Sequence, residues 1–204
     1  MLNRLNLTVR RGASAQIPIR LETPEKVFVP ITAMLRTAPM QIIAPGHGLL
    51  NGWRVGVMNA AGLTELNSSW DHLDHSRMYP VEVLGEDRIS LPDVNACGFR
   101  PYLSGGQLVY YAPLDLSTFS AARMDVKRSV GGTRLASFST AAGTMQLNAV
   151  DQVLWVLLTP ADTIALPPGD SVFDIELVRA SGDVVAMCSA ASSLTVLPEV
   201  TTST

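Results

Sequence analysis

The sequence predicts an all-β protein in which one β-sandwich is interrupted by a second, smaller β module. Short apolar segments with a period of two residues recur along the whole chain, as half-buried strands require. Clusters of glycine, proline, asparagine and aspartate separate these segments. The stretch from 27 to 111 holds its own set of strands and turns, while the segments on either side suit one common sandwich.

The first two expected strands lie before this insertion. Apolar and polar residues alternate over 4–10, Arg11-Gly12 breaks the pattern, and the alternation resumes over 16–21. We expect these strands to form a hairpin that needs a sheet from elsewhere. Pro18 has no amide hydrogen, which favours an edge strand, and Thr23-Pro24 is expected to end it.

The insertion supplies many short strands of its own. They are expected over 27–29, 31–35, 40–43, 53–58, 79–84, 88–91 and 108–111. This number of short strands with turns between them is typical of a compact β-barrel or a small sandwich. We therefore predict a small barrel-like module over 27–111.

The outer pattern resumes after Pro113. Strands are expected over 122–127, 134–138, 143–147, 153–158, 173–177 and 184–188. The continuously apolar run 153–158 predicts a buried strand, and Thr159-Pro160 predicts a short helical turn. Two strands before the insertion and about six after it suit an immunoglobulin-like sandwich of roughly 110 residues. The predicted domains are 1–26 with 112–204, and 27–111.

Composition narrows the classes of function. Of the 204 residues, 47% are hydrophobic and 16% are charged, and the net charge is −3. This balance disfavours binding to nucleic-acid phosphates and suits surfaces that partners cover. No apolar run reaches the length of a membrane span, and the first residues lack the apolar core of a signal peptide, so we expect no Sec export. Cys97 and Cys188 are expected to be free, buried thiols.

The insertion resembles a known module in the order of its motifs. These are Gly46-His47-Gly48-Leu49 with Asn51-Gly52, Gly62 with Glu65-Leu66-Asn67, Tyr79 with Val81, Ile89 with Leu91, and Phe99 through Gly106. They resemble the module named after the first catalytic cysteine half-domain (FCCH) of ubiquitin-activating enzymes, which is common in structural proteins of tailed phages. The segment Ser68–Met78 is longer and more polar than usual, and Cys97 replaces a small polar residue. The resemblance implies a structural module, so no thiol chemistry is expected of Cys97.

The outer segments are similar to immunoglobulin-like domains of phage tails and baseplates. The matching stretches are Leu114–Ser117, Ala122–Met124, Thr163 with Leu166–Gly169, Phe173–Leu177, Gly182–Val184 and the ending Val200-Thr201. The N-terminal domain of upper-baseplate proteins is the nearest comparison. Together, the resemblances imply a non-enzymatic structural protein of a tailed-phage virion, present in several copies and assembled in the host cytoplasm. A tail-tip or baseplate role, adapting the tail core to fibres or receptor-binding proteins, is favoured, with no cofactor.

Two alternative functions stay open at this point. A capsid decoration or head–tail collar protein would use the same modules to hold other virion subunits together. A carbohydrate-binding module would recognise a glycan on the host surface. Aromatic residues make up only 6% of the chain, which disfavours the glycan site.

His47 is the first candidate for chemistry, because a histidine between two glycines can act as a base. No nucleophile motif accompanies it, so we interpret His47 as part of a structural turn motif. The members of this motif are Gly46, His47, Gly48, Leu49, Asn51, Gly52, Leu66, Asn67, Gly105 and Gly106. We predict no catalytic residues.

The most polar cluster of the chain is a candidate metal site or interface. Asp71, His72, Asp74 and His75 carry side chains that ligate divalent metals, but their spacing matches no standard zinc signature. We therefore favour a loop that faces solvent or a partner, with Trp70 as a candidate interface anchor. The other candidate positions have structural interpretations: Trp53 and Trp155 in the cores, and Arg10-Arg11 and Lys127-Arg128 as solvated strand ends.

Overall fold

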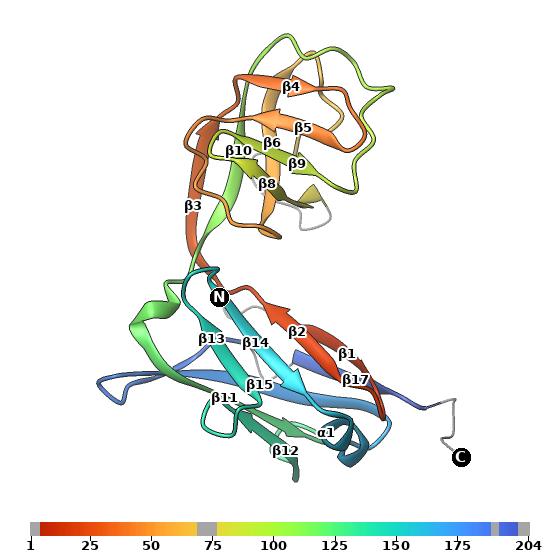
Figure 1. Ribbon diagram of the computed structural model, residues 1–204, viewed down its shortest axis with the longest axis vertical. Helices are drawn as coiled ribbons and strands as arrows, with labels where there is room; N and C mark the ends of the chain where they lie inside the picture. The colour runs from red at the N-terminus through yellow and green to blue at the C-terminus, as the bar shows by residue number, and fades with distance from the viewer. Residues whose placement is uncertain (1–4, 69–76, 189–191, 200–204) are drawn as a thin grey trace. The chain divides into compact units, whose positions relative to one another are not determined.

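The chain divides into two compact units in the computed structural model, which describes residues 5–68, 77–188 and 192–199 (Figure 1). Unit 1 consists of Met1–Leu21 and Leu114–Thr204, and unit 2 consists of Glu22–Pro113. Strands hold 55% of the residues and helices 5%. The predicted all-β fold class is therefore confirmed.

Unit 1 is a sandwich of two sheets around one core. The six-stranded sheet has the order β1 (Asn6–Arg10), β17 (Ser192–Leu197), β15 (Gly169–Arg179), β11 (Phe119–Lys127) and β12 (Arg134–Ser139), and β16 (Val184–Ala186) also pairs with β15. The three-stranded sheet has the order β13 (Met145–Asn148), β14 (Val153–Leu158) and β2 (Ala15–Ile19). Met124, Phe173 and Leu154 are almost fully buried between the sheets.

The predicted N-terminal hairpin is wrong. β1 pairs in parallel with β17, whereas β2 pairs antiparallel with β14 in the other sheet. The chain crosses between the two sheets because Val9 and Ile19 can then both be buried in the same core. Each strand pairs within its own chain, and β2 lies at a sheet edge, where Pro18 removes no ladder bond.

The segment after β14 forms the predicted helical turn. Helix α1 (Pro160–Ala165) has Thr159 as its N-cap, and a capping box joins Thr159 to Asp162. The buried-strand prediction for β14 needs one correction: Trp155 and Leu157 are only partly buried, because this strand faces the core with one side.

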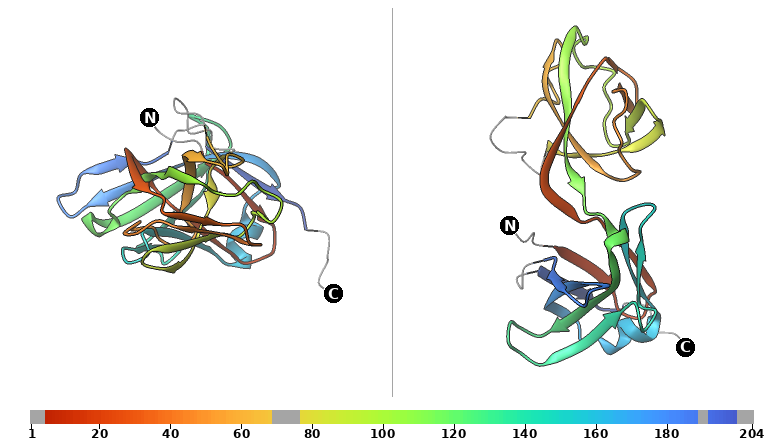
Figure 2. Two further views of the ribbon diagram at one scale, coloured as in Figure 1. Left: turned by 90° about the horizontal axis from the view of Figure 1, so that it is seen from above. Right: turned by 90° about the vertical axis from the view of Figure 1, so that its left-hand side faces the viewer.

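Unit 2 contains two four-stranded sheets. One has the order β3 (Glu22–Pro30), β10 (Ser104–Pro113), β6 (Arg54–Ala61) and β7 (Tyr79–Pro80). The other has the order β4 (Ala33–Leu35), β5 (Met40–Ile43), β9 (Arg88–Leu91) and β8 (Glu82–Gly85). The long strands β3 and β10 lie side by side in Figures 1 and 2, and their antiparallel pairing extends from Gln107↔Pro30 to Pro113↔Glu22.

The two sheets of unit 2 close into a barrel because the chain passes directly from one sheet to the other on both sides. Between β3 and β4, the Ile31 amide donates to the Gly106 carbonyl at 3.0 Å and the Thr32 amide donates to the Ile43 carbonyl at 2.9 Å. Between β7 and β8, the Val81 amide donates to the Trp53 carbonyl at 2.8 Å. Trp53 lies in the barrel core with 1% of its surface exposed. Closure of this kind leaves few strand edges open to solvent.

The units divide after Leu21 and after Pro113, whereas the sequence predicts boundaries after residues 26 and 111. The expected strand end at Thr23-Pro24 is wrong, because β3 begins at Glu22 and includes both residues. Polar residues fill this part of β3, so hydrophobic alternation could not reveal it. The ammonium group of Lys26 lies 5.9 Å from the ring centroid of Tyr111 on the paired strand.

Within the described residues, no helix is long and apolar enough to cross a membrane.

Candidate functional site

The first part of the turn motif lies along the outer edge of β8. Asn51 Oδ1 accepts a hydrogen bond from the Val83 amide at 2.6 Å. The His47 Nε2 atom lies 3.0 Å from the Gly85 carbonyl oxygen. The Gly52 amide donates to the Val81 carbonyl at 2.7 Å. The motif therefore binds backbone groups at alternate positions 81, 83 and 85, which would otherwise form an open strand edge.

His47 uses both ring nitrogens within this contact. Its Nδ1 atom accepts a hydrogen bond from the Leu49 amide at 3.0 Å, so the ring proton is on Nε2, which donates to Gly85. The side chain is buried, with 2% exposure. Gly46 and Gly48 have φ values of 66° and 60°, which glycine adopts without steric cost.

A residue of β10 also binds the turn that contains His47. The Tyr110 hydroxyl donates to the His47 carbonyl at 2.7 Å, and burial raises the pKa of Tyr110. A shallow pocket lies beside the turn, lined by Gly46, His47, Gly48, Leu49, Val83, Gly85 and Glu86. Because both His47 nitrogens have backbone partners, neither is available to take a proton from a molecule in this pocket.

The second part of the motif lies beside β6. The Asn67 side chain accepts from the Ala60 amide and donates to the Ala60 carbonyl, both at 3.0 Å. The Ser68 amide also donates to the Val57 carbonyl at 2.7 Å. Asn67 thus continues the ladder on β6 with its side-chain amide, and Leu66 is buried in the barrel core.

The glycines of the module allow segments of backbone to approach closely. A Cβ atom on Gly62, whose φ is 84°, would lie 2.2 Å from the Pro101 carbonyl oxygen. A Cβ atom on Gly106 would lie 3.0 Å from the Cα atom of Ala60. The Tyr102 hydroxyl donates to the Gly105 carbonyl at 2.8 Å and also contacts Ile31 O at 3.1 Å.

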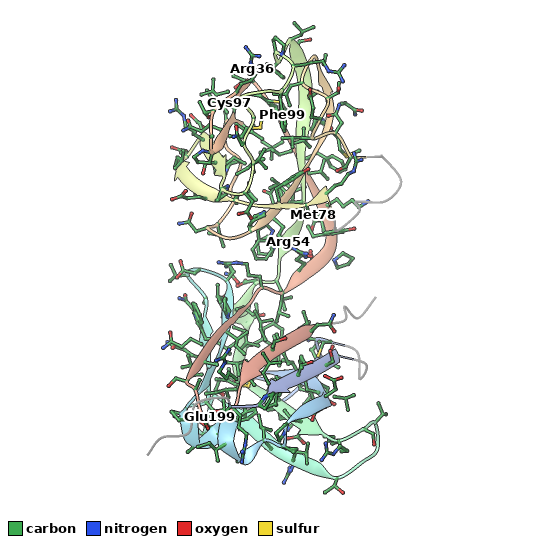
Figure 3. All side chains as sticks on the ribbon, turned by 90° about the vertical axis from the view of Figure 1, so that its right-hand side faces the viewer. Arg36, Arg54, Met78, Cys97, Phe99 and Glu199 are labelled. Carbon is green, nitrogen blue, oxygen red and sulfur yellow. The ribbon has the colours of Figure 1, made fainter. Side chains whose placement is uncertain are left out.

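Glu65 links this region to the 92–103 segment. Its Oε1 atom accepts from the Arg100 amide at 2.9 Å and from Arg100 Nε at 3.4 Å. The Arg100 amide is the main cause of the lowered pKa of Glu65. At the same end of unit 2, the Arg36 guanidinium donates to the Phe99 carbonyl at 3.0 Å (Figure 3). These ionic groups therefore tie loops together.

The predicted polar cluster of Trp70, Asp71, His72, Asp74 and His75 lies outside the described residues. Arg77 and Met78 are the first described residues after this cluster. Here the Arg77 guanidinium donates to the Asn67 carbonyl at 2.8 Å, and Met78 packs against Met58 and Val109. Within the described part of the chain, no group of three or more His, Cys, Asp or Glu residues is placed to hold a metal ion.

The two cysteines are free, as predicted, but only Cys188 is buried. Its Sγ atom lies 3.2 Å from the Ile175 amide, and burial raises the pKa of its thiol. The prediction that Cys97 is buried is wrong. Cys97 lies exposed in a loop, where its amide donates to Asn95 Oδ1 at 3.1 Å.

Polar groups on the sheet of unit 1 form strand-to-strand contacts. Arg123 pairs with Glu176 across β11 and β15, and Arg134 Nη1 lies 3.7 Å from Asp125 Oδ2. A small pocket near the β11–β12 turn is lined by Asp125, Lys127, Val130, Gly131, Val172, Phe173 and Asp174. In the basic pair Arg10-Arg11, the Arg11 guanidinium donates through Nε to the Ile164 carbonyl at 3.3 Å.

The contacts of the turn motif with β8 and β6 were not foreseen from the sequence. The spacing of His47 and Asn51 could not identify backbone groups at 81–85 as their partners, because no local pattern connects the two segments. Neither a protein-family model nor a curated protein matches this chain.

Proposed function

We propose that this protein is a non-enzymatic structural component of a tailed-phage virion. It belongs at the tail tip or baseplate, where it adapts the tail core to fibres or receptor-binding proteins. The proposal rests on the resemblance of the two parts of the chain to modules of phage structural proteins.

The structural observation that supports a non-enzymatic role is the use of the turn motif. Its most reactive side chain, His47, binds two backbone groups, and Asn51 and Asn67 bind backbone of neighbouring strands. The polar side chains of the motif thus bind backbone groups of the barrel. A rigid module of this kind supplies surfaces for neighbouring subunits rather than a site for a substrate.

The two-unit organisation supports the same proposal. A barrel inserted through two adjacent strands into a sandwich presents two separate surfaces from one chain. An adaptor needs this property, because one surface binds the symmetric core and the other binds the peripheral protein. The mechanism is assembly through shape, with edge strands and exposed side chains as the contact groups.

The proposal is tested by removing the gene from the phage that encodes it and examining the particles by electron microscopy. We expect tails that lack fibres or a complete tip, and restoration of both by the gene supplied in trans. Complete particles of normal infectivity would contradict the proposal. Intact tails with defective heads would favour the head-associated alternative, and complete particles that fail only to adsorb would favour glycan recognition.

A further inference from the structure

Strand β1 forms one edge of the six-stranded sheet of unit 1 (Figure 1). Its parallel pairing with β17 uses the backbone groups of alternate residues. The Ser193 amide donates to the Leu5 carbonyl, and the Arg11 amide donates to the Leu197 carbonyl, both at 2.9 Å. By this alternation, residues 5, 7, 9 and 11 face β17, so the amides and carbonyls of 6, 8 and 10 face away from it.

No described strand pairs with this outer edge of β1. The side chains of Asn6, Thr8 and Arg10 are exposed, and Leu7 on the core side is only partly buried. The strand has no proline and no β-bulge in its pairing with β17. An edge of this kind is a template for another strand.

The other edges of unit 1 are shorter or partly blocked. β2 contains Pro18, which has no amide to offer, and β13 has only four residues. On β12, the Thr144 side chain accepts from the Ser139 amide at 2.9 Å, so part of this edge is occupied. The edge of β1 is therefore the best template among the described strands of unit 1.

The sequence of β1 is complementary to itself in one antiparallel register. If Thr8 faces Thr8 of a second copy across a two-fold axis, Asn6 faces Arg10 of that copy and each facing pair can exchange two hydrogen bonds. The Arg10 carbonyl already accepts from the Ala13 amide at 3.3 Å, so its second lone pair serves the contact with the second copy. Paired threonines stabilise antiparallel strands, and no like charges face each other. On the core side, Leu7 then lies opposite Val9 of the second copy, which covers apolar surface of Leu7.

Two other arrangements are less favourable. Centring the pair on Arg10 would place two guanidinium groups opposite each other. In a parallel arrangement, Thr8 would lie opposite an odd-numbered residue of the second copy, whose side chain belongs to the core side. The polar face of one sheet would then continue into the core face of the other. The register centred on Thr8 keeps both sheets continuous, with polar side chains on one face.

We propose that β1 is a self-association edge, through which two copies of this chain join their six-stranded sheets by antiparallel β1–β1 pairing centred on Thr8. This contact goes beyond the proposed function, because it is a property of the purified protein and does not depend on where the chain acts.

The test is sedimentation velocity of the full-length protein from micromolar to millimolar concentration, with three variants. Thr8→Lys places two like charges on the axis and should weaken dimerisation by about tenfold or more. Thr8→Glu should do the same. A mixture of the two variants should dimerise again, because lysine then faces glutamate. Thr8 is exposed, so circular dichroism should show unchanged folding.

The matched control is Ser137→Lys on β12, the opposite edge of the same sheet. Ser137 is exposed, and its backbone groups also face away from the neighbouring strand. This variant should dimerise like the unmodified protein. A protein that stays monomeric up to millimolar concentration would overturn the proposal, as would a Thr8→Lys variant that dimerises normally. Failure of the lysine–glutamate mixture to dimerise would overturn the register centred on Thr8.

Discussion

His47 shows how a residue type associated with catalysis can serve a turn. Its two ring nitrogens bind the Leu49 amide and the Gly85 carbonyl, and its own carbonyl accepts from Tyr110. A neutral imidazole suits this position because one nitrogen must accept while the other donates. The contacts hold the turn against β8 and leave the ring without a free nitrogen.

Replacement of His47 should therefore reduce stability in a graded way. His47→Ala leaves the Leu49 amide without its partner and should lower the free energy of unfolding by about 1–3 kcal/mol. His47→Asn should lower it less, because an asparagine oxygen can accept from the amide two residues later. Urea denaturation measures both, with Glu86→Ala at an exposed position in the adjacent β8–β9 turn as a control. Equal stability of His47→Ala and the unmodified protein would contradict this role.

The two thiols should differ sharply in reactivity. Cys97 is exposed and should react quickly with Ellman's reagent in the folded protein. Cys188 is buried and its pKa is raised, so little reactive thiolate forms and labelling should require unfolding. Absorbance traces of the unmodified protein and of Cys97→Ser distinguish the two sites. A fast-reacting thiol that persists in Cys97→Ser would contradict the burial of Cys188.

At the scale of the elements, the barrel depends on a close approach between the β6 end and the segment before β10. Gly62 lies at this contact, with its missing Cβ directed at Pro101. Gly46 has a similar positive φ, but a Cβ there would meet no atom within 4 Å. Substitutions at Gly62 and Gly46 can therefore be compared. Both test the cost of a positive φ, and only the substitution at Gly62 adds a steric clash.

We expect Gly62→Ala to be more destabilising than Gly46→Ala. Gly46→Ala adds only the conformational cost, about 1–2 kcal/mol. Gly62→Ala adds a clash with backbone and should cost at least about 3 kcal/mol. Thermal unfolding followed by circular dichroism compares the two variants. If Gly46→Ala proves as destabilising as Gly62→Ala, the close approach at Pro101 is not a constraint on the barrel.

Local patterns predicted most of the elements but not their long-range partners. Alternation identified β1 and β2, and Thr159-Pro160 identified α1, because these signals lie within a few residues. The parallel pairing of β1 with β17 joins residues about 190 positions apart, which no local signal reveals. The polar start of β3 was missed because its residues pair with β10 without an apolar face.

The same limit applies to the candidate site. The glycines and His47 could be recognised as turn chemistry, since their residue types favour turns. Their contacts with Val83 and Gly85 depend on closure of the barrel, which is a property of the tertiary fold. The candidate cluster around Trp70 lies outside the described residues, so its role as an interface stays a prediction.

At the scale of the whole molecule, each unit has its own core and its own continuous set of sheets. Within each unit, the two residues at which the chain passes to the other unit also lie close together. The Leu114 amide donates to the Leu21 carbonyl at 2.8 Å, and Glu22 is paired with Pro113. A short linker can therefore replace unit 2 without stretching the chain of unit 1.

Each unit should accordingly fold when produced alone. We expect residues 22–113, and residues 1–21 joined to 114–204 by a short glycine-serine linker, to unfold cooperatively. Amide proton spectra of each piece should overlay on those of the full chain, apart from residues near the cuts. A piece that gives only the narrow amide dispersion of an unfolded chain would contradict the division into two independent units.

We propose above that this chain is a repeated structural component of a virion tail. It is tested most directly by locating and counting the protein in purified particles, with a tag that electron microscopy can resolve. We expect several copies per particle, all at the distal end of the tail. Infectious particles that contain none of the protein would contradict the claim, and copies confined to the head would contradict its place in the tail.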